Sequence, residues 1–248
     1  MWWATIRTVL FYLVSVPFTL TWAAFFGLIA YMIPYPLRYY LVIGGWARVM
    51  HLCTLYILGI RVRVHGRENV PQQACVIVAN HQSAWETYFL QLLFHPQSQV
   101  TKASLLKIPL FGWTFAMMKP IAIDRNNRRQ AMTQVVALGS QRIAQGNSVL
   151  IFPEGTRAAP EQLLPFRQGG ALLAQQAGCV MVPVSHNSGQ YWRNDQFAKR
   201  AGTIDIHIHT PLDTGAGEPA ELMARAAATI QHQLHGLARK SETIKSRE

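Results

Sequence analysis

A long apolar run opens the chain. Residues 9–33 contain no charged side chain, and Pro17 lies within them. Because a helix rises about 1.5 Å per residue, a run of this length can cross the apolar core of a bilayer. It is too long for the apolar region of a signal peptide, and no small-residue cleavage site follows it. The pattern predicts a membrane helix kinked at Pro17, which a membrane helix tolerates.

A second apolar stretch, residues 39–60, carries Arg48 and His51. These residues make it a poor spanning helix and favour a position at the membrane interface or against protein. Two arrangements stay open. Either the first segment spans while the second lies on the surface, or the two form a helical hairpin that dips into one leaflet. Two buried core helices are disfavoured, because the runs exceed ordinary core-helix lengths.

From position 61 onward, strand patterns alternate with helical ones. The strand patterns cover residues 61–65, 74–79, 148–152, 180–184 and 203–209. The helical patterns cover residues 84–94, 127–145, 169–177 and 218–237, and a charged tail that we expect to be mobile follows. This alternation predicts an α/β fold with a mostly parallel sheet flanked by helices. We therefore divide the chain into a membrane-associated helical segment, residues 1–60, and an α/β domain, residues 61–248.

Composition and charge narrow the class of partner. Half of the residues are hydrophobic and 14% are charged, against about 25% charged in soluble proteins. A net charge of +11 indicates an anionic partner, such as phospholipid headgroups or a phosphorylated substrate. Nucleic acid is disfavoured, because the basic residues are spread along the chain and no nucleic-acid module is recognisable. The three cysteines are widely spaced, which argues against a disulfide framework or a zinc knuckle.

The distribution of arginine predicts an orientation. Five arginines follow the first apolar segment between positions 38 and 67, and only Arg7 precedes it. If the segment spans, the excess of positive charge leaves the remainder of the chain in the cytoplasm. We expect a protein of the inner membrane, or its equivalent, with its α/β domain facing the cytoplasm.

A histidine and a carboxylate follow the buried strand at residues 74–79. His81 and Glu86 stand at the carboxyl end of that strand, where open α/β sheets bind ligands. With His81 in the loop and Glu86 in the first helical turn, the carboxylate can hold one imidazole nitrogen and leave the other free to accept a proton from an alcohol. A purely structural reading competes, because Ser83 and Glu86 also fit a helix capping box.

A second group follows the strand at residues 148–152. Pro153 and Gly155 force a turn that exposes backbone N–H groups, Thr156 adds a hydroxyl, and Arg157 adds a bidentate fork. A phosphate monoester is bound by such donors. An ordinary turn with a surface arginine is the alternative.

The order of these motifs is similar to that of a known family. His81-x4-Glu86, residues 102–112, Ile123-Asp124-Arg125, the block from Phe152 to Arg157, and Val182-Pro183-Val184 occur in succession. This arrangement resembles the 1-acyl-sn-glycerol-3-phosphate acyltransferase family, within the glycerolipid acyltransferase superfamily. The resemblance is close over residues 80–184. One departure is Glu86, where the family usually has Asp.

The resemblance implies an activity. A fatty acyl group passes from acyl-CoA or acyl-carrier-protein to the sn-2 hydroxyl of 1-acyl-glycerol-3-phosphate, a lysophosphatidic acid, and gives phosphatidic acid. His81 would be the general base, and Glu86 would orient its ring. No cofactor or metal is implied beyond the thioester cosubstrate. The implied contacts to the glycerol phosphate are Glu154, Gly155, Thr156 and Arg157, with Arg125 and Lys102 as further phosphate contacts.

Other functions stay open from the residues alone. The acceptor could be another lyso-lipid, water could replace it in a thioesterase, or the chain could bind lipid without catalysis. Asp205, His207 and His209 alternate on a predicted strand and so share one face, which is suggestive of a metal site. We do not predict one, because acyl transfer needs no metal and polar residues often line the solvated side of a strand.

Overall fold

The computed structural model of the chain describes residues 2–124 and 127–245, so the predicted phosphate contact Arg125 lies outside the described residues. Within them, seven strands form one sheet in the order β1-β7-β6-β2-β5-β3-β4. The strands are β1 (Ile60–His65), β2 (Val76–Ala79), β3 (Gln97–Lys102), β4 (Ile121–Ile123), β5 (Ser148–Ile151), β6 (Met181–His186) and β7 (Gly202–Ile208).

The sheet has two blocks of parallel strands. Strands β6, β2, β5, β3 and β4 run in one direction. Strand β7 lies antiparallel to β6 and parallel to the edge strand β1. The predicted α/β fold with a mostly parallel sheet is confirmed. The loops that follow β2, β5 and β6 lie together at the carboxyl ends of these strands.

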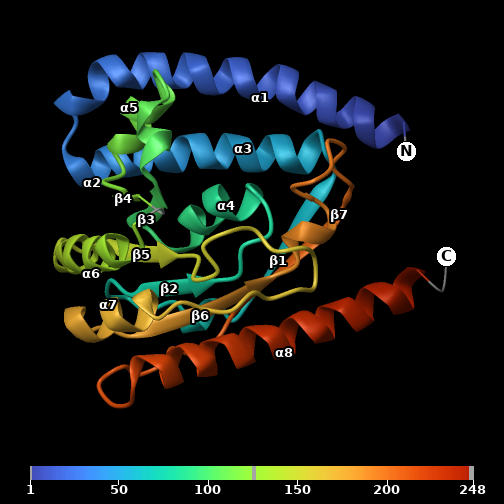
Figure 1. The fold of residues 1–248 in the computed structure, drawn as a ribbon. Helices are drawn as coiled ribbons and strands as arrows, with labels where there is room; N and C mark the ends of the chain where they lie inside the picture. Colours follow the sequence, from blue (N-terminus) through green and yellow to red (C-terminus); the bar gives the residue numbers. More distant parts are fainter. Residues whose placement is uncertain (1, 125–126, 246–248) are drawn as a thin grey trace.

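Helices cover both faces of the sheet (Figure 1). Strand β2 explains why, because it is buried throughout. Ile77 and Ala79 belong to one apolar cluster with helix α4, whereas Val76 and Val78 belong to another with α7 and α8. A strand buried on both faces must carry apolar residues at every position. The helices of this part are α4 (Trp85–Leu93), α5 (Phe111–Ala116), α6 (Arg128–Ala144), α7 (Gly169–Ala177) and α8 (Pro219–Lys245).

The N-terminal helices form a hairpin over the α4 side of the sheet. In Figure 1, α3 lies between α1 and α4, and α1 is the outermost layer. Two indole N–H groups join the arms: Trp22 donates to the carbonyl oxygen of Val42 at 2.9 Å, and Trp46 donates to Thr19 Oγ1 at 3.0 Å. The two apolar segments therefore lie side by side as a helical hairpin, with the second stretch packed against protein. The segments are α1 (Trp2–Ile29), a 3-10 turn (Ala30–Met32), α2 (Tyr35–Arg38), a π-helical turn (Tyr39–Gly44) and α3 (Gly45–Tyr56).

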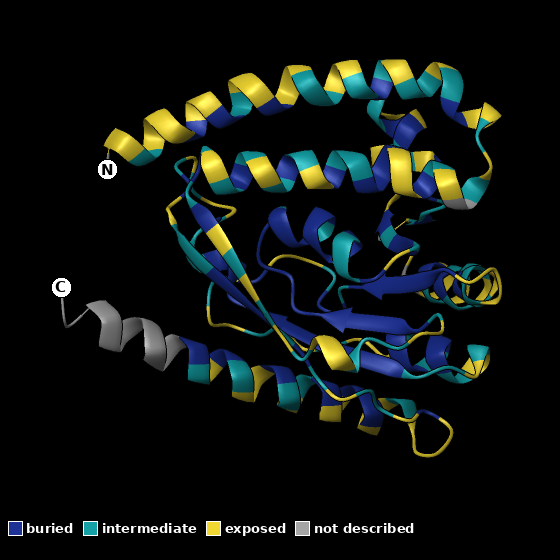
Figure 2. Ribbon diagram, turned by 180° about the vertical axis from the view of Figure 1, so that it is seen from behind, coloured by how far each residue is buried: buried dark blue, intermediate teal, exposed yellow. Residues whose placement is uncertain are grey.

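Helix α1 exposes an apolar surface (Figure 2). Among the described residues, one helical segment, Trp2–Met32, is long and apolar enough to cross a membrane, and only 17% of its most apolar window is buried in the molecule. Trp3 and Leu13 are exposed by 78% and 67%. Exposure of large side chains along a whole helix favours contact with lipid.

The predicted strands and helices of the α/β part are present, with four differences. Strands β3 and β4 and helix α5 were not predicted, and α8 continues to Lys245, well past residue 237. Residues 238–245, predicted to belong to a mobile tail, are therefore helical.

Candidate active site

Three loops meet where β6, β2 and β5 end. Asn80 and His186, at the ends of β2 and β6, hold two of these loops together. The Asn80 side-chain amide donates to the backbone oxygen of His186 and accepts from its N–H, both at 3.0 Å. The His186 ring donates through Nε2 to the backbone oxygen of Asn80 at 2.8 Å. This double link fixes the position from which the next residue, His81, projects.

His81 and Glu86 form a buried pair. The distance from His81 Nδ1 to Glu86 Oε1 is 2.9 Å, and the His81 ring stacks on Phe152 with a centroid separation of 4.1 Å. The His81 side chain keeps 11% of its surface accessible, whereas that of Glu86 keeps none. Residues five apart meet here because His81 lies in the loop and Glu86 in the first turn of α4.

The Glu86 carboxylate accepts five hydrogen bonds. Oε1 accepts from His81 Nδ1, from the Gln82 N–H at 2.8 Å and from the Ser83 N–H at 2.7 Å. Oε2 accepts from the hydroxyls of Ser83 and Ser188, the latter at 2.9 Å. Ser83 Oγ also accepts from the Trp85 N–H at 3.0 Å, and with the Ser83 N–H bond to Glu86 these contacts satisfy backbone donors at the start of α4, as a capping box does. The capping and catalytic interpretations of Glu86 are therefore compatible, since one carboxylate has both sets of contacts.

These contacts determine the charge and the tautomer. Burial by itself would raise the pKa of Glu86, but the neighbouring His186 ring and the hydrogen bonds from His81 and Ser83 outweigh it and hold the pKa below its usual range. An ionised carboxylate only accepts hydrogen bonds, so the neutral His81 ring must carry its proton on Nδ1. Its Nε2 then presents a lone pair, as a general base requires.

Glu154 contacts backbone groups of two neighbouring loops. It is buried, and its two oxygens accept hydrogen bonds from the N–H groups of His81 at 2.7 Å and Leu164 at 2.9 Å. With both oxygens engaged by backbone donors, the carboxylate ties the turn after β5 to the loop after β2. The sequence groups Glu154 with the substrate contacts, whereas its contacts in the structure are those of a positioning residue.

The rest of the predicted phosphate site lies on the turn after β5. Thr156 and Arg157 are exposed, and Arg157 Nη1 donates to Asn194 Oδ1. Gly155 has a φ of 74°, and a Cβ built there would lie 2.9 Å from Cζ of Arg167. The Arg167 guanidinium therefore crosses this turn, where only glycine leaves it room. The structure thus brings Arg167 beside the predicted contacts.

Lys102 is more remote. It ends β3, and its side chain is exposed. Strand β5 separates β3 from β2, so Lys102 stands two strands away from His81.

A loop after β6 connects the site to helix α1. The Lys199 N–H donates to Thr8 Oγ1 in α1 at 2.8 Å, and the Lys199 ammonium donates to the backbone oxygens of Arg193 at 3.1 Å and Gln196 at 2.6 Å. Asn194, which holds Arg157, lies inside the segment that this ammonium closes. Sequence reasoning did not identify Lys199, because its partners are backbone atoms that only the folded loop brings together.

Replacing Lys199 by Met should loosen this loop. Removing hydrogen bonds worth on the order of 1.4 kcal/mol should speed amide hydrogen exchange of residues 191–201 by about tenfold, while β2 stays protected. Hydrogen exchange followed by mass spectrometry measures this, with Lys107→Met as the control for loss of a lysine elsewhere. Unchanged exchange in the loop would show that the ammonium does not close it.

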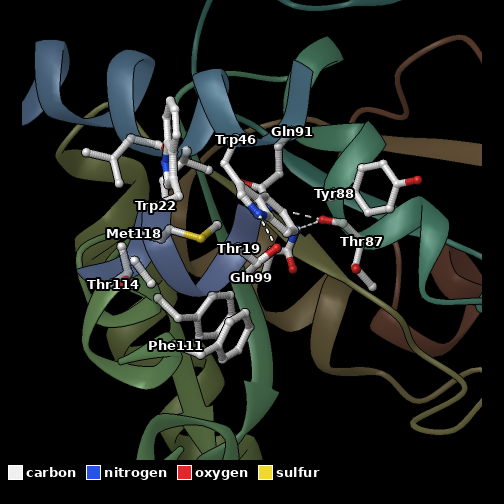
Figure 3. A pocket seen from close by; sticks show the side chains of 14 residues that line it. Thr19, Trp22, Trp46, Thr87, Tyr88, Gln91, Gln99, Phe111, Thr114 and Met118 are labelled. Carbon is white, nitrogen blue, oxygen red and sulfur yellow. Dashed lines mark hydrogen bonds between the residues drawn. The ribbon is translucent and has the colours of Figure 1, made fainter. Parts of the chain in front are cut away.

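Two cavities flank the site. One, of about 270 Å³, is lined by Phe152, Gly155 and Arg167 together with apolar residues of β3, β5 and α6. The other, of about 90 Å³, lies between the hairpin and helices α4 and α5 (Figure 3). Threonine and glutamine side chains contribute to its lining, but most of the surface that it exposes is apolar. Its lining includes Thr87 and Tyr88, which directly follow Glu86 on α4, and the two indoles that join the hairpin.

The alternating residues on β7 and directly after it contact neighbours of their own. Asp205 pairs with Arg63 at 3.1 Å, His209 contacts Ser185 at 2.9 Å, and His207 contacts Gln233 at 3.0 Å. Within residues 2–124 and 127–245, no group of three or more His, Cys, Asp or Glu could hold a metal ion.

Comparisons with known proteins agree with this architecture. A family model described as acyltransferase matches residues 61–187. A Pseudomonas aeruginosa protein named 1-acyl-sn-glycerol-3-phosphate acyltransferase is 42% identical over 92% of this chain and 90% of its own length. A Saccharomyces cerevisiae protein of the same name is 34% identical over 68% of this chain and 57% of its own.

A solved structure shares the fold. The 1-acyl-sn-glycerophosphate (LPA) acyltransferase PlsC from Thermotoga maritima superposes with a TM-score of 0.80 at 22% identity, covering 94% of this chain and 95% of that one. By its matching residues and its similarity to the P. aeruginosa protein, the chain belongs to the 1-acyl-sn-glycerol-3-phosphate acyltransferase family.

Proposed function

We propose that this protein transfers a fatty acyl group from an acyl thioester to the sn-2 hydroxyl of 1-acyl-glycerol-3-phosphate, giving phosphatidic acid for phospholipid synthesis. The observation that carries the proposal is the buried His81–Glu86 pair, with a free imidazole nitrogen, beside a turn that presents Arg157 and Arg167. The names of the relatives support this choice of acceptor.

The chemistry follows from the protonation states. His81 Nε2 removes the proton of the acceptor hydroxyl. The oxygen of that hydroxyl then attacks the thioester carbonyl carbon. The Glu86 anion stabilises the imidazolium that forms. The tetrahedral intermediate expels the thiolate, which takes up the proton from His81 and leaves as the free thiol. No side-chain nucleophile is needed, so no acyl-enzyme forms.

Two arginines supply the phosphate contacts. Arg157 and Arg167 come from the two ends of the loop between β5 and α7, and both side chains are exposed. Guanidinium groups bind phosphate through paired charge-assisted hydrogen bonds. Glu154 is the positioning residue that holds the turn against His81.

The apolar surfaces suit the two lipid substrates. We assign an acyl chain to the cavity between the hairpin and helices α4 and α5, because its walls are mostly apolar and it borders the helix that carries Glu86. The exposed face of α1 keeps the protein at a membrane, where the acceptor resides. We further propose the cytoplasmic side of the inner membrane, and either acyl-CoA or acyl-carrier-protein as donor.

Product analysis tests the acceptor. Purified protein in detergent receives a labelled long-chain acyl-CoA, or acyl-carrier-protein thioester, with one acceptor at a time, and mass spectrometry identifies the lipid formed. We expect phosphatidic acid from 1-acyl-glycerol-3-phosphate. Acylation of a lyso-lipid without a terminal phosphate, at an equal or greater rate, would assign the chain to another acceptor.

Replacing Arg157 by Ala should mainly raise the KM for the acceptor. Loss of a charge-assisted contact to phosphate is worth about 1.5–3 kcal/mol, which corresponds to a KM increase of roughly 10- to 100-fold with little change in kcat. Steady-state kinetics with varied acceptor measure the effect. Arg193→Ala is the matched control, because Arg193 is a nearby, partly exposed arginine whose side chain pairs with Asp195. A lower kcat at unchanged KM would move Arg157 to the transition state.

A further inference from the structure

A second group of cations lies at the amino ends of the parallel strands, whereas His81 lies at their carboxyl ends. It consists of Arg38 at the end of α2, Lys119 just before β4, and Arg142 in the last turn of α6. Strands β4 and β5 begin after these segments, so the group lies at the amino ends of the parallel strands. The reaction proposed above uses none of these residues.

Lys119 and Arg142 converge on one neutral oxygen. The Lys119 ammonium lies 3.1 Å and Arg142 Nη1 lies 3.4 Å from Oε1 of Gln145. Arg142 Nε also donates to the backbone oxygen of Lys119 at 3.0 Å, which fixes the two residues relative to each other. An amide oxygen occupies the place where two cations would normally share an anion.

Aromatic rings hold the third cation nearby. Lys119 Nζ lies 3.9 Å from the centroid of the Tyr35 ring, and the Arg38 guanidinium lies 5.7 Å from the same ring and 5.3 Å from that of Tyr31. Among the described residues, Nε of Arg38 is buried and has no hydrogen-bond partner. A buried donor without an acceptor is costly unless a ligand satisfies it.

The three positive charges of this group have no carboxylate partner among the described salt bridges. None of the salt bridges between described residues involves Arg38, Lys119 or Arg142. Burial lowers the pKa of Lys119, and the two arginines lower it further, so the three positive charges disfavour one another. An anion bound between them would remove this repulsion.

We propose that Arg38, Lys119 and Arg142 bind a phosphate group, and that an anionic membrane phospholipid supplies it. The surroundings favour a lipid source. Leu28, Tyr31 and Met32 form the tip of the hairpin, and they are exposed by 83%, 69% and 85%. A lipid whose chains contact this apolar tip brings its headgroup phosphate to the adjacent cations. Tyr31 and Tyr35 have the amphipathic character of residues at the headgroup level.

Lipid binding to the intact protein tests this site. Native mass spectrometry of the full chain in detergent, titrated with phosphatidylglycerol, gives the affinity for this lipid. Diacylglycerol, which lacks a phosphate group, is the control lipid. The double variant Lys119→Gln/Arg142→Gln should bind phosphatidylglycerol about 30-fold more weakly, since each cation near a lipid surface contributes about 1 kcal/mol. Arg38→Gln, a single change at the hairpin, should weaken it in the same direction. Arg129→Gln on α6 is the control for loss of charge, and its affinity should not change.

Further arms separate the alternatives. Arg157→Ala should leave phosphatidylglycerol binding unchanged, because Arg157 lies at the carboxyl ends of the strands and the proposed site lies at their amino ends. If Arg157→Ala removes the binding and the double variant does not, the lipid occupies the active site and the proposal is wrong. Equal affinity for diacylglycerol would likewise overturn it. If isothermal titration detects inorganic phosphate at this site while phosphatidylglycerol does not bind, the assignment to a lipid is wrong.

Discussion

Replacing His81 by Ala should lower kcat/KM for acyl transfer by about 10³-fold, within the range that a positioned general base contributes. The change removes the only group in the described site that combines a free lone pair, a fixed tautomer and partial exposure. The acceptor hydroxyl would keep its proton, and the attack on the thioester would lose its driving force. Steady-state kinetics with saturating donor measure the loss.

The fold of the variant needs its own control. The His81 ring stacks on Phe152, so Ala also leaves a gap. His81→Gln retains most of the volume and lacks the base, and it should be as inactive as the alanine variant. Both variants should unfold near the wild-type temperature, because the backbone contacts of His81 to Glu154 and Ala158 remain. Activity within tenfold of wild type in either folded variant would contradict the role of His81.

Replacing Glu86 by Gln should lower kcat by about 10²-fold with the fold retained, because the anion that stabilises the imidazolium is lost. The contacts predict how the amide will orient. The three donors on Oε1 include two backbone N–H groups that cannot accept, whereas Oε2 faces the hydroxyls of Ser83 and Ser188, which can. The amide oxygen should therefore take the Oε1 position, and His81 should keep its proton on Nδ1.

Three measurements distinguish this expectation from a structural role. Thermal unfolding reports on the helix cap, acceptor binding reports on the phosphate site, and kcat reports on the charge. We expect a modest change in unfolding temperature, unchanged acceptor affinity and the loss in kcat. A protein that is simply unfolded would mean that Glu86 acts as a cap alone.

The parts of the fold that follow from apolar pattern could be predicted. Strands β2, β5 and β6 are apolar because both faces are covered, and the loops after them contain His81, the turn at residues 153–157 and Ser188. Strand β3 could not be predicted, since it begins with Gln97-Ser98-Gln99, a polar run that is typical of an exposed segment. In the structure these residues are buried, and Gln97 and Gln99 donate to the backbone oxygens of Leu90 and Thr87 in α4.

The site was predictable where one motif holds both partners. His81 and Glu86 lie five residues apart and share one loop and helix start. Ser188 donates to Glu86 from 102 positions away, and it could have been found only from the rule that neighbouring parallel strands end at one edge. The positioning contacts of Glu154 join two backbone N–H groups, and the sequence gives no signal for such partners.

The arrangement of the N-terminal segment depends on contacts that no hydropathy pattern contains. Residues 39–60 are too polar to span, but their place under α1 is set by the bonds of Trp22 and Trp46. The hydroxyls of Thr54 in α3 and Tyr88 in α4, 2.6 Å apart, then join the hairpin to the α/β part. These specific bonds hold the two arms of the hairpin together and against the α/β part.

The most direct test of the central claim is the release of thiol from a long-chain acyl-CoA by the purified protein, with and without 1-acyl-glycerol-3-phosphate, beside His81→Ala. We predict release that requires both the acceptor and His81, with phosphatidic acid formed in equal amount, and acyl-carrier-protein thioester takes the place of acyl-CoA if the latter is inert. Release without acceptor would make the protein a thioesterase. Release that persists in folded His81→Ala would contradict the assignment of the base.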